Sequence, residues 1–256
     1  MNLKNLFSLK KKLIVLIGGD GIIGKKILEG LSHCGAKIIV IEKKNKKEKK
    51  KKANIFYHKI DISELMTLED KITELIEKFG VPDGVINCSY PKTDDWSKNN
   101  YKEINLDSFL KNIEIHLISF IWIAKLFADA MKIKRKGSII QLGSIYGSLG
   151  QDENLYSKTN ISESITYPVI KGGIINSVRS MASHYGKYNL RINSISPGGI
   201  EDGQNKKFIK RYAEKTPLKR MAKPDDIVGA SIYLLSDSSL YVSGIDLKID
   251  GGWSSI

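Results

Sequence analysis

Tyr167 and Lys171 are the two side chains whose types and spacing most readily suggest chemistry. If residues 165–185 form a helix, the two lie one turn apart on the same face. An ammonium beside a phenol favours phenolate, so we expect the pKa of Tyr167 to fall from about 10 toward the working pH, as a general acid or base requires. Ser144 follows a predicted strand, where its hydroxyl could hold a carbonyl or alcohol oxygen. The alternative is an ordinary helix with an exposed tyrosine and lysine, so the surrounding elements decide.

Length and composition favour a soluble globular protein. The chain has 256 residues, of which 41% are hydrophobic and 27% charged, and we expect one domain over 1–256. No apolar run approaches the roughly 20 residues needed to span a bilayer. The first residues lack the apolar region of a secretory signal, so a cytoplasmic location is expected. Cys34 and Cys88 suit a reducing compartment and lack metal-site spacing, and no metal is expected.

The net charge of +13 is concentrated in one stretch, because Lys43 to Lys52 contains eight lysines in ten positions. Such a run could bind nucleic acid or another polyanion. No aromatic interleaving or DNA-reading motif accompanies it, which favours a solvated loop. Nucleic acid is therefore not an expected partner.

A glycine-rich turn follows the first predicted strand. Residues 13–17 are continuously apolar, as in a strand buried on both faces of a parallel sheet, and a helix is expected from 22 to 34. Glycines at such a turn let the backbone approach a pyrophosphate, while the helix N-terminus offers free N–H groups. The residues expected to bind it are Gly18, Asp20, Gly21, Ile22, Ile23 and Gly24.

Two acidic residues follow the next two predicted strands, 37–41 and 54–59. Glu42 is placed to accept hydrogen bonds from ribose hydroxyls and to repel a 2'-phosphate, which favours NAD over NADP. Lys43 and Lys44 act in the opposite direction, so NADP stays open. Asp61 could accept from an adenine amino group, or either Asp61 or Ser63 could simply cap the next helix.

The remaining pattern alternates helices and strands. A helix is expected over 65–79, a long one over 106–132 and another over 165–185, with strands at 84–87, 138–142 and 191–195. This alternation predicts one doubly wound α/β domain with a mostly parallel sheet of about seven strands and helices on both faces. Ligands of such sheets bind beyond the strand carboxyl ends. The long helix is apolar nearly all round, so its own core or a subunit partner should bury it.

An ordered set of motifs along nearly the whole chain resembles the short-chain dehydrogenase/reductase family. The set comprises the glycine turn 18–24, Asn87, Ser144, Tyr167, Lys171, Arg191-Ile192-Asn193, Pro197-Gly198, Arg220, Pro224-Asp225-Asp226-Ile227, Ser243-Gly244 and Ile249-Asp250-Gly251-Gly252. The resemblance implies an NAD(P)-dependent oxidoreductase in which the tyrosine is the acid/base, the serine orients the carbonyl and the lysine also binds nicotinamide ribose. It adds Asn87, Pro197, Gly198 and Ile200 to the cofactor site.

Several positions depart from the family pattern. The usual threonine before the glycine turn is Ile17, and the middle glycine is Ile22. Tyr90 ends the stretch that is asparagine-asparagine-alanine-glycine in the family. His116 stands where an asparagine often supports the lysine through water, and it either takes that role or is merely packed. The threonine that often follows Pro-Gly is not evident around Ile200.

The spacing from Ser144 to Tyr167 is longer than usual because of a polar inserted segment, residues 151–166. Such a segment is expected to contact substrate. Here the chain is similar to flagellin-modification oxidoreductases of surface-sugar pathways, which implies a sugar or sugar-phosphate substrate. A basic group after Pro-Gly could meet a phosphate or be a solvated helix face: Lys206, Lys207, Lys210 and Arg211.

Two other functions stay open. One is a nucleotide-binding or assembly protein that keeps the fold without catalysis, suggested by Ile17 and Ile22. The other is a polyanion-binding protein that uses Lys43 to Lys52. A homodimer or homotetramer is expected, with helices 106–132 and 165–185 at the subunit interface.

Overall fold

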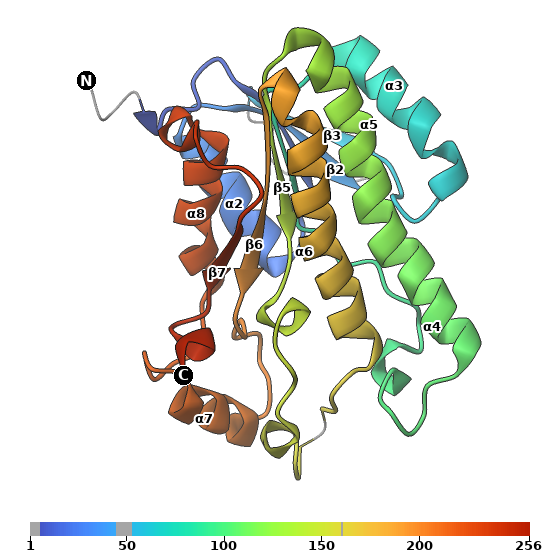
Figure 1. Cartoon of the computed structure of the whole chain (residues 1–256), viewed down its shortest axis with the longest axis vertical. Helices are drawn as coiled ribbons and strands as arrows, with labels where there is room; N and C mark the ends of the chain where they lie inside the picture. Colours follow the sequence, from blue (N-terminus) through green and yellow to red (C-terminus); the bar gives the residue numbers. More distant parts are fainter. Residues whose placement is uncertain (1–5, 45–52, 160) are drawn as a thin grey trace.

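The fold is built on one parallel sheet. A computed structural model describes residues 6–44, 53–159 and 161–256. Seven strands pair in the order β3-β2-β1-β4-β5-β6-β7, all parallel (Figure 1). The strands are β1 Leu13–Ile17, β2 Lys37–Glu42, β3 Ile55–Lys59, β4 Gly84–Asn87, β5 Gly137–Leu142, β6 Leu190–Pro197 and β7 Asp246–Ile249. The predicted doubly wound α/β sheet is confirmed.

Helices cover both faces of the sheet (Figure 1). The α-helices are α2 Ile22–His33, α3 Leu68–Phe79, α4 Leu106–Asn112, α5 Ser119–Lys134, α6 Thr166–Tyr185, α7 Lys206–Lys215 and α8 Val228–Leu235. α2 and α8 pack on one face, and α3, α5 and α6 pack on the other. α7 lies away from both faces, at the end of the molecule near the C-terminus (Figure 1).

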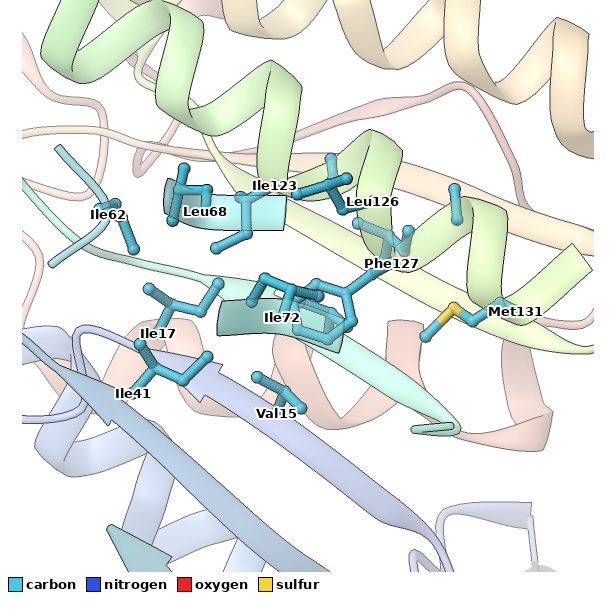
Figure 2. Close-up of a cluster of buried hydrophobic side chains, with 14 of the residues drawn as sticks. Val15, Ile17, Ile41, Ile62, Leu68, Ile72, Ile123, Leu126, Phe127 and Met131 are labelled. Atoms are coloured by element: carbon cyan, nitrogen blue, oxygen red, sulfur yellow. The ribbon is translucent and has the colours of Figure 1, made fainter. Parts of the chain in front are cut away.

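Strands at the centre of the sheet, such as β1, are apolar because both of their sides are buried, whereas the edge strands β3 and β7 are only half-buried. In β1, Val15 and Ile17 point into the cluster that includes α3 and α5, whereas Ile14 and Leu16 point into the cluster that includes α2 and α8. Figure 2 shows the first cluster, in which side chains from β1 and β2 meet Ile72 and α5 residues. Alternating side chains therefore fill two cores from one apolar run.

The helix expected over 106–132 is not one regular helix. α4 starts where Asn105 Oδ1 accepts a hydrogen bond from the Ser108 N–H at 2.9 Å, but a π-helical segment, Ile113–Ile118, separates it from α5. A π-helical segment inserts extra backbone into a turn and is frequent at functional sites. Here the segment carries His116, whose ring packs against Tyr90 in the loop after β4. None of the helices in the described ranges is long and apolar enough to cross a membrane.

Candidate active site

Two adjoining cavities open at the carboxyl ends of the strands. One, of about 210 Å³, lies over β5 and β6 and is lined by Ser144, Tyr167 and Lys171; we call it the catalytic cavity. The other, of about 360 Å³, lies over β1, β2 and β3 and includes Glu42 and Asp61; we call it the nucleotide cavity. Both are lined by Cys88, Ser89 and Tyr90, the residues that follow β4. The topology thus brings together residues more than a hundred positions apart.

The glycine turn is a backbone surface with little room for side chains. Gly18 has φ +81°, and a Cβ there would lie 2.6 Å from the Ser89 Cα. A Cβ on Gly24 would lie 2.0 Å from the Gly18 carbonyl oxygen. α2 starts after Gly21 with no side-chain cap, so its first N–H groups and positive dipole end face the turn. Asp20, Ile22 and Ile23 lie in the same turn.

The acidic edge of the nucleotide cavity is already hydrogen-bonded. Glu42 Oε1 accepts from the Asp20 N–H at 2.6 Å, which ties the end of β2 to the glycine turn. Asp61 Oδ1 accepts from the N–H and hydroxyl of Ser63, at 3.0 and 2.6 Å. Its Oδ2 forms an ion pair with Lys43 Nζ at 2.9 Å. Asp61 therefore closes a local turn onto Ser63 and caps no helix, because α3 begins after Thr67 without a side-chain cap. Lys43 is held by Asp61.

Ser144, Tyr167 and Lys171 converge on the catalytic cavity. Ser144 follows β5, and its Oγ accepts from the Tyr146 N–H at 3.2 Å. Tyr167 and Lys171 occupy the first turns of α6, whose start is held by a hydrogen bond from the Tyr167 N–H to Ser164 Oγ at 3.1 Å. Lys171 is buried, and its Nζ donates to the Leu142 carbonyl oxygen at 2.8 Å. The helix therefore presents the phenol and the amine on one face.

The expected direction of the Tyr167 pKa is wrong. Burial raises the pKa of Tyr167, and a hydrogen bond with Ser144 opposes that rise only in part. Burial also lowers the pKa of Lys171 to about 7, with a small opposing influence from Cys88. Removing both groups from water disfavours phenolate and ammonium alike, and burial is the largest influence on each pKa.

His116 lies inside the protein beside the catalytic cavity. It is fully buried. Its ring packs edge-on against Tyr90, with centroids 5.2 Å apart, and at a tilt against Phe120, with centroids 5.1 Å apart. Burial and then the Lys171 charge hold its pKa well below the usual range. The Pro91 backbone approaches the ring, but neither ring nitrogen meets hydrogen-bond geometry with a described residue. A neutral imidazole is therefore placed near Lys171.

The other predicted cofactor residues surround the same edge. Asn87 ends β4, and its Oδ1 accepts from the N–H and hydroxyl of Ser89 at 3.2 and 2.6 Å. Pro197 ends β6, and the Gly198 N–H donates to the Ile249 carbonyl oxygen at 2.9 Å. Ile200 pairs with Ala222 in an isolated bridge and lines the catalytic cavity together with Pro197 and Gly198.

The described part of the inserted segment is docked on α7. Leu155 is buried in a cluster with Phe208 and Tyr212 of α7. Arg211 donates to the backbone carbonyls of Asn154, at 3.2 Å, and of Leu155 and Ser157. Arg211 thus serves the inserted segment, which removes it from the predicted phosphate group.

Sequence reasoning missed the aromatic walls of the catalytic cavity. Tyr90 and Tyr146 both line it, and the Tyr156 hydroxyl of the inserted segment donates to the Tyr146 hydroxyl at 3.4 Å. The sequence held one usable signal, because Tyr90 stands where the resembled family has glycine. Tyr146 carried no comparable signal.

The residues present fit a nicotinamide dinucleotide. The close-packed turn of Gly18 and Gly24 leaves only backbone at the start of α2, where a pyrophosphate is neutralised best. The two cavities meet at Cys88, Ser89 and Tyr90, so a two-part ligand can span them. A carboxylate, Glu42, stands at the end of β2 in the nucleotide cavity.

Comparisons with known proteins agree with this geometry. Residues 20–254 match the family model described as Enoyl-(Acyl carrier protein) reductase. Post-translational flagellin modification protein A of Campylobacter coli is 32% identical over 253 residues, covering 96% of this chain and 99% of that protein. L-rhamnose-1-dehydrogenase of Scheffersomyces stipitis is 30% identical over 263 residues, covering 95% and 96%.

A solved structure gives the same result. A short chain dehydrogenase from Leptospira borgpetersenii, crystallised with bound NAD+, has a TM-score of 0.87 and 30% identity, and covers 99% of this chain and 97% of that one. The sheet order, the residues gathered at its carboxyl edge and these matches lead to one conclusion. The chain belongs to the short-chain dehydrogenase/reductase family of NAD(P)-dependent oxidoreductases.

Proposed function

We propose that this protein transfers a hydride between nicotinamide and a carbonyl or secondary alcohol of a sugar or sugar derivative. The observation that carries the proposal is the convergence of Ser144, Tyr167 and Lys171 on one cavity at the carboxyl ends of β5 and β6. This convergence supports a site in which a hydroxyl, a phenol and an amine surround a single reacting oxygen.

In the mechanism, Tyr167 exchanges the proton of the reacting oxygen. When bound, the nicotinamide cofactor gives or takes the hydride. In reduction, the Tyr167 hydroxyl protonates the oxygen as its carbon receives the hydride, and Ser144 donates a hydrogen bond to the same oxygen. Lys171, when charged, stabilises the phenolate that is left. His116 stays neutral beside Tyr90 and so adds no second positive charge near Lys171.

The cofactor residues divide by chemistry. The backbone of the glycine turn and the N-terminus of α2 hold the pyrophosphate. Glu42 accepts from the ribose hydroxyls and disfavours a 2'-phosphate, and Lys43 is paired with Asp61, so NAD is preferred over NADP. Asn87, Pro197, Gly198 and Ile200 contact the nicotinamide half.

The substrate proposal rests on relatives and on the cavity. Flagellin modification protein A and L-rhamnose-1-dehydrogenase are among the relatives, and the latter is named for a sugar. Lys171 is the only charged residue among those that line the catalytic cavity in the described part of the chain. Apart from Lys171, polar contacts to the reacting end of the substrate come from uncharged groups, and any phosphate extends outward toward Lys206, Lys207 and Lys210 on α7.

We also propose one domain over residues 1–256, a cytoplasmic location and a homodimer or homotetramer. The single sheet draws strands from residue 13 to residue 249, which supports the first. Exposed apolar side chains on α4 and the following helices, namely Leu106, Leu110, Ile118, Trp122 and Val169, support a subunit interface there. Most of the lysine run, residues 45–52, lies outside the described residues.

Tyr167→Phe tests the proposed chemistry. The variant keeps the ring and loses the exchangeable proton, so we expect turnover of a sugar or polyol panel to fall by about 10²–10⁴-fold. Affinity for NADH, followed by nicotinamide fluorescence, should stay within about twofold, because the variant loses only one hydroxyl and keeps the glycine turn. A twofold change corresponds to about 0.4 kcal/mol of binding free energy. Full turnover in this variant would contradict the role of Tyr167. Tight cofactor binding by the wild type with no turnover of any panel member would favour the non-catalytic nucleotide-binding alternative.

A further inference from the structure

The ammonium of Lys171 lies among three aromatic rings. Its Nζ lies over the rings of Phe120, Tyr167 and Tyr90, at 5.2, 5.7 and 5.9 Å from their centroids. Its single hydrogen bond recorded in the described structure goes to the Leu142 carbonyl oxygen. No carboxylate lines the catalytic cavity among the described residues. Among the described residues, Lys171 therefore lacks the ion-pair partner that a buried lysine usually has. The faces of three aromatic rings surround its ammonium instead of a carboxylate.

Ring faces can stabilise a buried cation. The negative face of an aromatic ring attracts an ammonium within about 6 Å, and the attraction is stronger when both are removed from water. Burial acts in the opposite direction and draws the pKa of Lys171 down to about 7. The charged fraction of Lys171 near neutral pH thus depends on the balance between burial, which lowers its pKa, and attraction to the ring faces, which raises it.

Of the three rings, only that of Tyr90 has no other role assigned to it besides contact with the Lys171 ammonium. Tyr167 takes part in the reaction, and Phe120 is a fully buried core residue. Tyr90 is partly exposed and lies in a loop, where Trp96 and His116 hold it by edge-on contacts at 5.7 and 5.2 Å between ring centroids. A glycine at this position, as in the resembled family, would have no ring to offer.

We propose that Tyr90 is a positioning residue whose ring face holds the charged form of Lys171 beside Tyr167. The inference rests on the proposed function, in which the Lys171 charge stabilises the Tyr167 phenolate. Tyr90 would then replace, with a cation–π contact, part of the stabilisation that a carboxylate supplies to other buried lysines. Its ring also lies at the junction of the two cavities, beside the cofactor path.

The groups that face Lys171 fix the sign of the effect. From the loop after β4 they are Cys88 and Tyr90, from the π-helical segment His116, from the segment after β5 Tyr146, and from α6 Tyr167. Lys92 lies 5.9 Å from the Tyr90 ring centroid. Cys88, Tyr146 and Tyr167 have raised pKa values and are neutral near pH 7, and His116 has a lowered pKa and is neutral too. Loss of the Tyr90 ring should therefore lower the pKa of Lys171 further.

The test compares Tyr90→Phe, which keeps the ring face, with Tyr90→Leu, which keeps apolar bulk and loses it. The pKa of Lys171 is measured in the cofactor-free full chain by NMR titration of ¹³C-labelled lysine side chains, with Lys171→Arg to assign the signal. We expect the pKa to be unchanged in Tyr90→Phe and lower by about 0.4–1.5 in Tyr90→Leu. Tyr101→Leu is the matched control, because Tyr101 is exposed in the same loop region and has no ring contact recorded with Lys171.

Activity gives a second measurement. In alcohol oxidation Tyr167 must release its proton, so the rising limb of log kcat/KM against pH should move to higher pH in Tyr90→Leu and stay in place in Tyr90→Phe. Equal Lys171 pKa values in the Phe and Leu variants would overturn the inference. If the wild type shows no turnover, the proposed function fails while the NMR titration still decides the role of Tyr90. If Tyr90→Leu does not fold, Tyr90→Gly takes its place with the same expected fall.

Discussion

The two halves of the site use different physical means. The nucleotide half is made of backbone N–H groups, a close-packed glycine turn and two carboxylates that already have partners, Glu42 and Asp61. The catalytic half is made of aromatic walls around one buried lysine, with no carboxylate among its described lining residues. One half therefore recognises by shape and fixed charge, and the other sets proton affinities by exclusion of water.

The two halves of the site should also contribute differently to the free energy of unfolding. A charge buried without an ion-pair partner destabilises the fold, whereas the glycine turn fits its own backbone. Substitutions of Lys171 should therefore separate stability from activity, and substitutions in the glycine turn should lower both together.

Lys171→Met should show the largest difference between its effect on activity and its effect on stability. We expect turnover to fall by at least about 10²-fold. The free energy of unfolding at pH 7 should rise by about 2–5 kcal/mol, because the pKa of Lys171 is about 7 in the fold against 10.5 in the unfolded chain. Urea unfolding monitored at pH 7 and pH 10 measures this.

The sign of the pH dependence follows from those two pKa values. Between pH 7 and 10.5 the unfolded chain binds more protons at this lysine, so wild-type stability rises with pH relative to the variant. The advantage of Lys171→Met should therefore be full below pH 7 and nearly vanish by about pH 10. A variant that is less stable than the wild type at pH 7 would contradict the proposed cost. Lys25→Met, at an exposed position of α2, is the control and should show no such dependence.

Gly24→Ala tests the nucleotide half. The added Cβ would lie 2.0 Å from the Gly18 carbonyl oxygen and 2.8 Å from the Gly19 Cα, so the turn must shift. We expect NADH affinity to fall more than about tenfold and stability to fall by about 1–3 kcal/mol. The matched control is Gly229→Ala in α8, where a Cβ meets nothing within 4 Å and stability should hold or rise slightly. Equal NADH affinity in the two variants would refute the role of the turn.

Glu42→Gln is expected to have the smallest effect. The amide keeps an oxygen to accept from the Asp20 N–H and loses the charge that repels a 2'-phosphate. The ratio of NADPH to NADH dissociation constants should fall by about tenfold, which corresponds to about 1.4 kcal/mol. Fluorescence titrations with both cofactors measure it, and Glu29→Gln on the outer side of α2 serves as the control. An unchanged ratio would assign the preference to other residues.

Much of the fold could be predicted because its signals are local. The apolar runs of β1 and β2 and the glycines between them are contiguous in the sequence, and each of the six strands predicted with bounds ends within two residues of its prediction. The π-helical segment Ile113–Ile118 was not predictable, since apolar residues all round a helix fit a regular and an irregular turn equally well.

The candidate site divides in the same way. Residue types and spacing were enough to select Ser144, Tyr167 and Lys171, because a helix fixes which side chains share a face. The aromatic residues around them, Tyr90 and Tyr146, belong to segments whose relative positions depend on the sheet order. The pKa direction of Tyr167 was also predicted wrongly, because spacing reveals a neighbouring charge but not the depth of burial.

Short-range pattern and chemical type were enough to predict the parallel α/β architecture, the glycine turn and the side chains that can exchange a proton. The burial of Lys171 among Phe120, Tyr167 and Tyr90 became visible only in the folded chain. The same holds for the ion pair of Lys43 with Asp61 and for the contact of the inserted segment with α7. Proton affinity and ion pairing depend on solvent exclusion and on distances across the fold, which no local pattern encodes.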